Sequence, residues 1–136
     1  MAHPEMFDHD DPLLDRVRQI ALGFPGAAEK VSHGRPAFFT KKVFAYYGGS
    51  VRRGAGDWVQ HPQSIMVLLD SDERAALLSN SHLFVPAYLG PAGWLGVDLA
   101  PTSDFEEITE LVEMSYRVTA PVRLVVELDA GRGKLG

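Results

Sequence analysis

Apolar side chains near the start of the chain recur every three or four residues, the spacing of one face of an α-helix. Asp11 precedes this stretch and Pro12 opens it, a pair that suits an N-cap and the first helical position. The stretch stops at Gly23 and the dipeptide Pro25-Gly26. The pattern predicts a first helix from Pro12, with an inner face made of Leu13, Val17, Ile20, Ala21 and Phe24.

The pattern then changes to short runs rich in β-branched and aromatic residues. These runs cover residues 31–32, 37–40 and 43–47, and they predict three short antiparallel strands with a tight turn at residues 40–42. The segment 48–63 contains four glycines and one proline and shows little alternation. We therefore expect 48–63 to be a long loop and the most mobile internal segment.

Residues 64–69 are continuously apolar apart from Ser64 and predict a buried strand. Asp70 then opens a second helix with Glu73 as its capping-box partner, and Ala75, Leu77 and Leu78 are expected to face inward. Strand patterns return at residues 83–88 and 94–99, on either side of a Gly-Pro-Ala-Gly turn.

Ser103 and Glu106 predict another capping box at the start of a third helix, which Pro121 ends. The apolar stripe of this helix consists of Phe105, Ile108, Leu111, Val112 and Ser115. Residues 122–128 fit either a short strand or a last helical turn. The expected order is helix, three strands, helix, two strands, helix. It predicts an α+β fold, a two-layer sandwich with the helices on one face of an antiparallel sheet.

A length of 136 residues fits a single domain, expected at 11–128 between a flexible arm (1–10) and a flexible tail (129–136). The absence of cysteine excludes disulfides, thiolate catalysis and cysteine-based zinc sites. The apolar runs are too short to span a membrane, and the acidic N-terminal residues lack the features of a signal peptide. A cytoplasmic protein without a membrane partner is the expectation.

Charge is distributed unevenly along the chain. The net charge is −5, yet the window from residue 30 to 53 holds six of the 13 basic residues and none of the 18 acidic ones. The six are Lys30, Arg35, Lys41, Lys42, Arg52 and Arg53. Such a window can contact nucleic-acid phosphates, or it can be a solvated strand whose basic stems cover apolar surface.

The tetrapeptide His33-Gly34-Arg35-Pro36 also has two interpretations. His33 has the chemistry of a general base, and Arg35 that of a bidentate ligand for phosphate or carboxylate. Alternatively, Gly34 and Pro36 simply form a turn that leads into a strand. The turn accounts for both residue types without any substrate.

Three aromatic residues beside glycines are candidates for contact with a ligand: Trp58, Tyr88 and Trp94. They can stack on bases or line a pocket, although Trp94 opens an alternating strand and is expected to be substantially buried. The five histidines lack metal-ligand spacing, the serines lack a nucleophile motif, and no phosphate-binding loop occurs. No metal, cofactor or catalytic residue is expected.

Several motifs, in order, resemble those of the YjbR family, also called MmcQ-like proteins. They are FPGAAEKVSHGRPAF, the LLD before a short helix, PAYLGPAGWLGVDL and the closing SYRVTAPVRL. The resemblance covers residues 11–128 and departs from the family pattern mainly in 48–63. It implies a two-layer fold similar to secretion chaperones and to frataxin, and DNA binding through a double-wing motif. It implies no catalytic activity.

Three hypotheses follow. The first is a non-enzymatic module that binds DNA through the basic stretch 30–53. The second is a protein-interaction or chaperone-like module that uses an exposed sheet face or edge and forms a homodimer. The third is an enzyme that acts on a small anionic substrate at His33 and Arg35.

Overall fold

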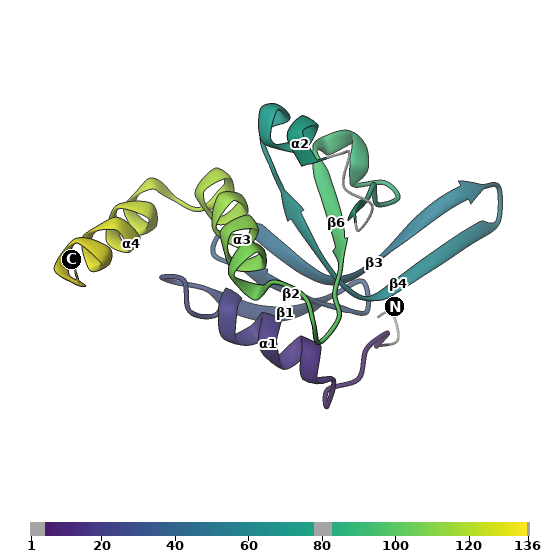
Figure 1. Ribbon diagram of the computed structural model, residues 1–136, viewed down its shortest axis with the longest axis horizontal. Helices are drawn as coiled ribbons and strands as arrows, with labels where there is room; N and C mark the ends of the chain where they lie inside the picture. The colour runs from purple at the N-terminus through teal and green to yellow at the C-terminus, as the bar shows by residue number, and fades with distance from the viewer. Residues whose placement is uncertain (1–4, 78–82, 136) are drawn as a thin grey trace.

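The computed structural model describes residues 5–77 and 83–135. Over these residues the chain forms one six-stranded antiparallel sheet in the order β1-β2-β3-β4-β6-β5 (Figure 1). The elements are α1 (Pro12–Ala21), β1 (Ala28–Ser32), β2 (Arg35–Phe39), β3 (Val43–Gly54), β4 (Asp57–Leu68), α2 (Ser71–Leu77), β5 (Leu83–Phe84), the 3-10 turn η1 (Gly90–Ala92), β6 (Trp94–Asp98), α3 (Phe105–Thr119) and α4 (Val122–Leu135). The predicted α+β class is confirmed.

The first helix begins where the sequence predicts. The Asp11 carboxylate accepts a hydrogen bond from the Leu13 N–H at 2.9 Å and so caps α1. The same carboxylate accepts a hydrogen bond from the Tyr47 hydroxyl of β3, which joins the cap to the sheet. The segment expected to be a free arm is tied at Met6, whose N–H donates to the Gly34 carbonyl at 2.7 Å; residues 1–4 lie outside the described part.

The predicted loop 48–63 is wrong, because this segment is a β-hairpin. β3 and β4 pair through it with Val51 opposite Val59 and Arg52 opposite Trp58. Two of its glycines, Gly48 and Gly49, lie where other side chains approach the backbone closely. A Cβ on Gly49 would lie 2.8 Å from the Met66 sulfur and 3.1 Å from the Phe84 ring. Four strands precede α2, as the strand patterns at 31–32, 37–40, 43–47 and 64–69 predict one by one; the expected order of three omits one of them.

The second helix begins as predicted, but its inner face differs from the prediction. Asp70 accepts from the Glu73 N–H at 2.9 Å as expected, but Ala75 on α2 is exposed and only Leu77 packs on the core. Leu78 lies outside the described residues. A short helix that covers only the end of the sheet buries few of its side chains.

The predicted box of Ser103 and Glu106 is also wrong. The N-cap of α3 is Asp104, whose carboxylate accepts from the Glu106 and Glu107 N–H groups at 3.1 and 3.2 Å. The Ser103 hydroxyl instead accepts from the Ala100 N–H at 2.8 Å and closes the preceding turn. A carboxylate satisfies two of the free N–H groups at a helix start and complements its positive end.

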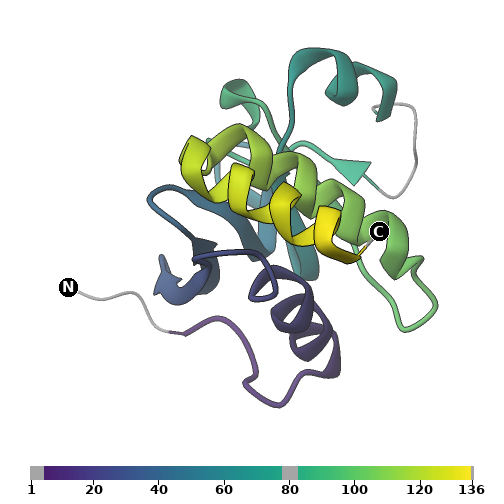
Figure 2. The same cartoon turned by 90° about the vertical axis from the view of Figure 1, so that its left-hand side faces the viewer.

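The strand-or-helix alternative for residues 122–128 is resolved as helix, because α4 runs from Val122 to Leu135. The residues expected to form a tail from 129 onward are thus helical as far as 135. Arg132 pairs with Glu113 and Arg117 pairs with Asp129 at 2.7 Å, so ion pairs join α4 to α3. Figure 2 shows these two consecutive helices along their length.

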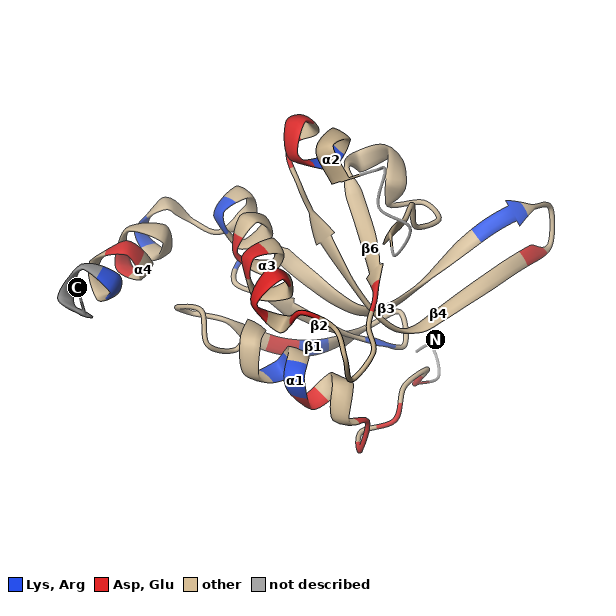
Figure 3. Ribbon diagram, viewed as in Figure 1, with Lys and Arg blue, Asp and Glu red and all other residues tan. Residues whose placement is uncertain are grey.

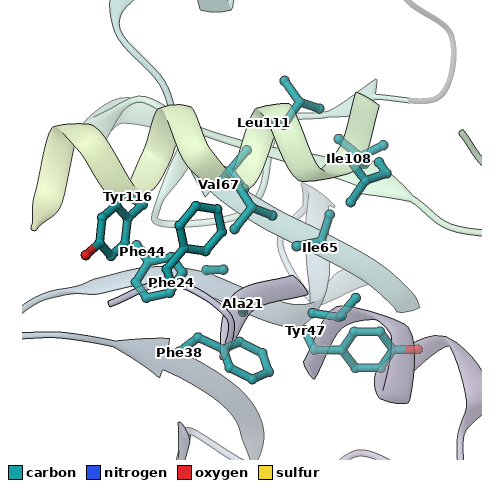
Figure 4. Packing of buried hydrophobic residues seen from close by; sticks show 14 of the residues in the cluster. Ala21, Phe24, Phe38, Phe44, Tyr47, Ile65, Val67, Ile108, Leu111 and Tyr116 are labelled. Carbon is teal, nitrogen blue, oxygen red and sulfur yellow. The ribbon is translucent and has the colours of Figure 1, made fainter. Parts of the chain in front are cut away.

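The main core lies between the sheet and the helices α1 and α3 (Figure 4). Phe24 stacks on Tyr116 with 4.9 Å between ring centroids, and Phe44 meets Tyr116 edge to face at 5.4 Å. Trp94 is 8% exposed, as expected of a buried residue. Among the described residues no helix is long and apolar enough to cross a membrane.

One buried polar side chain links the helix layer to the sheet. The Ser115 hydroxyl on α3 donates to the Phe44 carbonyl of β3 at 2.6 Å and accepts from the Leu68 N–H of β4 at 2.8 Å. Ala45 pairs with Val67, so Phe44 and Leu68 would form the next rung of the ladder. The hydroxyl therefore bridges two backbone groups at the point where the β3–β4 pairing ends.

Replacing Ser115 by Ala should leave both backbone groups buried without this partner. At roughly 1–3 kcal/mol for each unsatisfied group, we expect a loss of about 2 kcal/mol or more in the free energy of unfolding. Denaturant melts followed by circular dichroism measure the loss, and Ser71→Ala on the exposed start of α2 is the matched control, expected within about 0.5 kcal/mol of the parent. Equal stability of the two variants would contradict the proposed bridge.

Candidate functional site

The face of the sheet turned away from α1 and α3 carries most of the candidate residues. Side chains alternate along a strand, so residues beside core positions such as Ala45 and Val67 point to this second face, called here the outer face. The strand registers place one row across it: Lys30, Ala37, Tyr46, Met66 and Gly96 on five neighbouring strands. The outer face thus combines aromatic, sulfur-containing and basic groups.

A cavity of about 500 Å³ is hollowed into the outer face. Its floor is formed by Tyr46 and Met66, and Arg35 lies on one side. The opposite wall is the segment 86–89 between β5 and η1, which the Ala87 N–H fastens to the Ser50 carbonyl at 2.8 Å. We call this cavity the outer-face pocket. It collects residues from four separate stretches of sequence.

Arg35 is held in a prepared position. Its Nη2 donates to Gln60 Oε1 at 2.6 Å, and a Cβ on residue 48 would collide with its Nη1. Gly48 has φ 87°, a conformation that also favours glycine. Desolvation lowers the pKa of Arg35, and no described acidic group offsets this effect.

His33 and Gly34 form the two-residue turn between β1 and β2. Their φ angles are 52° and 82°, as a hairpin turn with both central residues in the left-handed region requires. The backbone of His33 and Gly34 therefore forms the turn that the second interpretation of this tetrapeptide expects. The His33 side chain nevertheless lies at the edge of the outer-face pocket, and the same turn starts the strand that carries Arg35.

Tyr88 is the second residue of the pocket with a left-handed backbone. Its φ is 65°, and the Leu89 N–H donates to the Ala87 carbonyl at 2.7 Å, which closes a strained γ-turn around it. The side chain is 76% exposed, and its ring lies 5.7 Å from that of Trp58. Non-glycine residues in such strained conformations concentrate at binding sites.

Trp58 does find local partners, although the sequence suggests none. It is 40% exposed, and the Arg52 guanidinium lies over its ring at 5.7 Å, a cation–π distance. Arg52, Trp58 and Tyr88 thus form one series of contacts that begins next to the tip of the β3–β4 hairpin. Trp94, by contrast, packs on Tyr46 with 5.2 Å between centroids and is a packing residue.

The six basic residues do not form a single cluster. Arg52 and Arg53 lie near the tip of the β3–β4 hairpin, which projects from the molecule in Figure 3. Lys41 and Lys42 lie in the turn before β3, roughly 30 Å away at about 3.3 Å per strand residue. Lys30 sits over the Phe39 ring at 4.7 Å. In the described part of the chain, no ion pair involves any of the six.

Sequence reasoning missed one polar pair on this face. His61 Nδ1 lies 2.7 Å from Asp98 Oδ1, and the His61 ring stacks on Phe84 with 3.9 Å between centroids. These residues are far apart in sequence, and only the pairing of β4 with β6 brings them together. Within residues 5–77 and 83–135, no group of three histidine or acidic residues could hold a metal ion.

The position of Arg35 makes a prediction for Gly48→Ala. A left-handed backbone costs a residue with a Cβ about 1–2 kcal/mol, and the added methyl would also collide with Arg35. In the protein that keeps Arg35, we expect Gly48→Ala to lower the free energy of unfolding by more than the backbone conformation alone would. With Arg35→Ala as the second change, thermal melts should show a coupling of about 0.5–3 kcal/mol in a double-mutant cycle. Additive effects would mean that the guanidinium does not occupy this position.

Comparisons with known proteins locate the chain within a family. The family model for YjbR matches residues 22–118. Protein DR2400 of Deinococcus radiodurans, a crystal structure with a domain assigned to DUF419, is similar with a TM-score of 0.55 and 18% identity, over 76% of this chain and 75% of that one. At this identity the likeness concerns the fold alone. No curated protein matches. Because the family model covers well over half of its length, the chain belongs to the YjbR family.

Proposed function

We propose that this protein is a non-enzymatic module that binds DNA through the β3–β4 hairpin and the adjoining outer face of the sheet. The observation that carries the proposal is the form of the hairpin. β3 pairs with β2 only as far as Tyr46, and β4 pairs with β6 only from Ser64 onward. Beyond these points, within the described sheet, β3 and β4 pair only with each other and form a two-stranded ribbon, which segment 86–89 contacts at Ser50. A ribbon of this kind can enter a nucleic-acid groove.

The side chains of the ribbon suit a polyanion. Arg52 and Arg53 are exposed near the tip, where Asp57 is the one acidic residue on the described ribbon. Beside the arginines, Trp58 and Tyr88 present exposed rings on which a nucleobase can stack. Arginine for phosphates combined with aromatic rings for bases is a pattern of sequence-tolerant nucleic-acid binding.

The distribution of charge supports the same orientation. The exposed carboxylates of α3, which are Glu106, Glu107 and Glu110, lie on the helix side of the molecule, away from the hairpin (Figure 3). Despite the net charge of −5, a DNA approaching the ribbon would meet a locally basic surface. Binding would then depend on one end of the protein rather than on its total charge.

The geometry also divides the basic window into two parts. Lys41 and Lys42 lie at the far end of β3 from Arg52 and Arg53, so one contact with the hairpin tip would not include them. We assign the main phosphate contacts to the arginine pair and a minor role to the lysine pair. Neither pair is placed to read base edges in a defined order, and we expect little sequence preference.

Two variants with the same loss of charge test this division. Arg52→Ala/Arg53→Ala should weaken binding to a labelled duplex and make the log–log salt dependence shallower by up to about two units, since each neutralised phosphate contributes about 0.9. Lys41→Ala/Lys42→Ala is the matched control and should change both quantities much less. Fluorescence anisotropy at several salt concentrations measures them.

Equal effects of the two double variants would indicate general electrostatic attraction without a hairpin site. No measurable binding by the parent protein below about 0.1 mM at physiological salt would place it at or beyond the weak end of non-specific affinity and would refute the proposal. In that case the protein-interaction hypothesis, with the edge strand β1 as its surface, would become the leading one.

A further inference from the structure

We infer that the outer-face pocket is a binding site for a small aromatic oxyanion, meaning a flat ring that carries a carboxylate or phosphate group. The inference rests on three features of the pocket: an arginine that has no acidic partner among the described residues, an apolar and aromatic slot beside it, and a strained segment that forms one wall. It does not rest on DNA binding, although Ser50 and Gln60 of the hairpin help to form the pocket.

The anion-binding element is Arg35. Its guanidinium has five N–H donors, and within the described structure its hydrogen bond to a side chain is the one from Nη2 to Gln60. Desolvation alone shifts the pKa of this residue, which means that its charge is withdrawn from water without compensation by a described carboxylate. A partly buried, unneutralised guanidinium favours an oxyanion that it can bind through two parallel hydrogen bonds.

The position of this guanidinium is built into the backbone. Gly48 leaves the space that Nη1 occupies, and Gln60, opposite Ser50 in the hairpin, holds Nη2. The three residues belong to β2, β3 and β4, so the pairing of these strands brings the space and the hydrogen-bond partner to one place. An arginine that only needed to be solvated would require none of these arrangements.

The slot beside Arg35 is suited to a ring. Tyr46 and Met66 form its floor, and Pro86 and Leu89 lie opposite. The Tyr46 hydroxyl is protonated near pH 7 and can donate a hydrogen bond, and burial raises its pKa further. A cavity of about 500 Å³ falls within the usual range of about 300–1,000 Å³ for small-molecule sites. It is too large and too apolar for a bare inorganic ion.

The strained wall completes the site. Tyr88 carries a left-handed backbone within a γ-turn, and the ring lies at the pocket with 76% of its surface exposed. Strain of this kind persists where surrounding structure fixes it, and it is common at ligand clamps. The Ala87–Ser50 hydrogen bond fixes the segment to β3 and leaves the Tyr88 ring at the mouth of the slot. An incoming ring would cover this exposed surface.

Four probes test the site by isothermal titration calorimetry and two-dimensional NMR. Adenosine 5′-monophosphate and indole-3-carboxylate each combine a ring with an oxyanion, and inorganic phosphate and adenosine each supply one part. We expect both complete probes to bind at least about tenfold more tightly than either part, and to shift the amide signals of residues 46–49 and 86–89. If only the nucleotide does so, the oxyanion is a phosphate and the ring a nucleobase; if only the carboxylate does so, the ligand is a free aromatic acid.

Variants separate binding from folding. Arg35→Gln should remove at least about tenfold of the affinity for a complete probe while leaving the affinity for adenosine unchanged, and Arg35→Lys should restore only part of it, because it keeps the charge without the fork. Lys30→Gln is the matched control, since Lys30 is a cation of the same face outside the pocket, and it should bind as the parent does. Tyr88→Ala should weaken complete probes and adenosine, but not phosphate.

Three results would overturn the inference. These are no binding of either complete probe at about 1 mM, the limit of weak affinity, affinity for phosphate alone that equals that of the complete probes, or unchanged binding by a folded Arg35→Gln variant. DNA binding is measured separately with the hairpin variants. A failure of that proposal would leave these outcomes unaffected, and the reverse also holds.

Discussion

The hydrogen bonds of Ser115 hold the two layers of this protein in a fixed relation. A single hydroxyl group on α3 satisfies a carbonyl of β3 and an N–H of β4, in a place that water does not reach. Apolar packing between helix and sheet is largely non-directional, whereas these two bonds define one position along the strands. The anchor lies at the end of the β3–β4 pairing opposite to the hairpin tip, so it fixes the part of the two strands that carries the core.

On the outer face of the sheet, two glycines determine where side chains can lie against the backbone. Gly48 makes room for a guanidinium, and Gly49 lets Met66 and Phe84 come close to the backbone. Both lie beside an irregularity in the pairing of β3 with β4, and such irregularities redirect strands and side chains near binding sites. The pocket and the hairpin are consequently neighbours on one pair of strands, yet their chemistry differs. In the pocket, Arg35 lies beside aromatic rings around a cavity. On the hairpin, Arg52 and Arg53 are exposed on a two-stranded ribbon.

Local signals in the sequence predicted local structure well. The Asp11-Pro12 start of α1 and the turn at residues 40–42 depend on neighbouring residues, and both are found. The hairpin 48–63 was mistaken for a loop because two of its glycines, Gly48 and Gly49, make room for Arg35, Met66 and Phe84, which are distant in sequence. Gly56, with φ 76°, belongs instead to the turn at the tip and is a local signal of the hairpin.

The candidate site was predictable only in parts. The motif around His33 and Arg35 and the aromatic residues Trp58 and Tyr88 were recognised separately, but their meeting around one cavity required the strand registers. Tyr46 and Met66 look like ordinary core residues in the sequence, since alternation alone does not tell which face of a sheet is covered. The His61–Asp98 pair had no sequence signal, because the two residues lie on different strands and only the pairing of β4 with β6 brings them together.

The two tryptophans occupy very different surroundings, and this has a practical consequence. Trp94 is 8% exposed within the sheet, while Trp58 is 40% exposed on the hairpin with an arginine over its ring. Indole emission shifts to longer wavelength and becomes open to collisional quenchers as water gains access. The protein therefore carries two intrinsic optical reporters without any labelling: a blue-emitting one for the integrity of the sheet, and a red-shifted, quenchable one for the state of the hairpin.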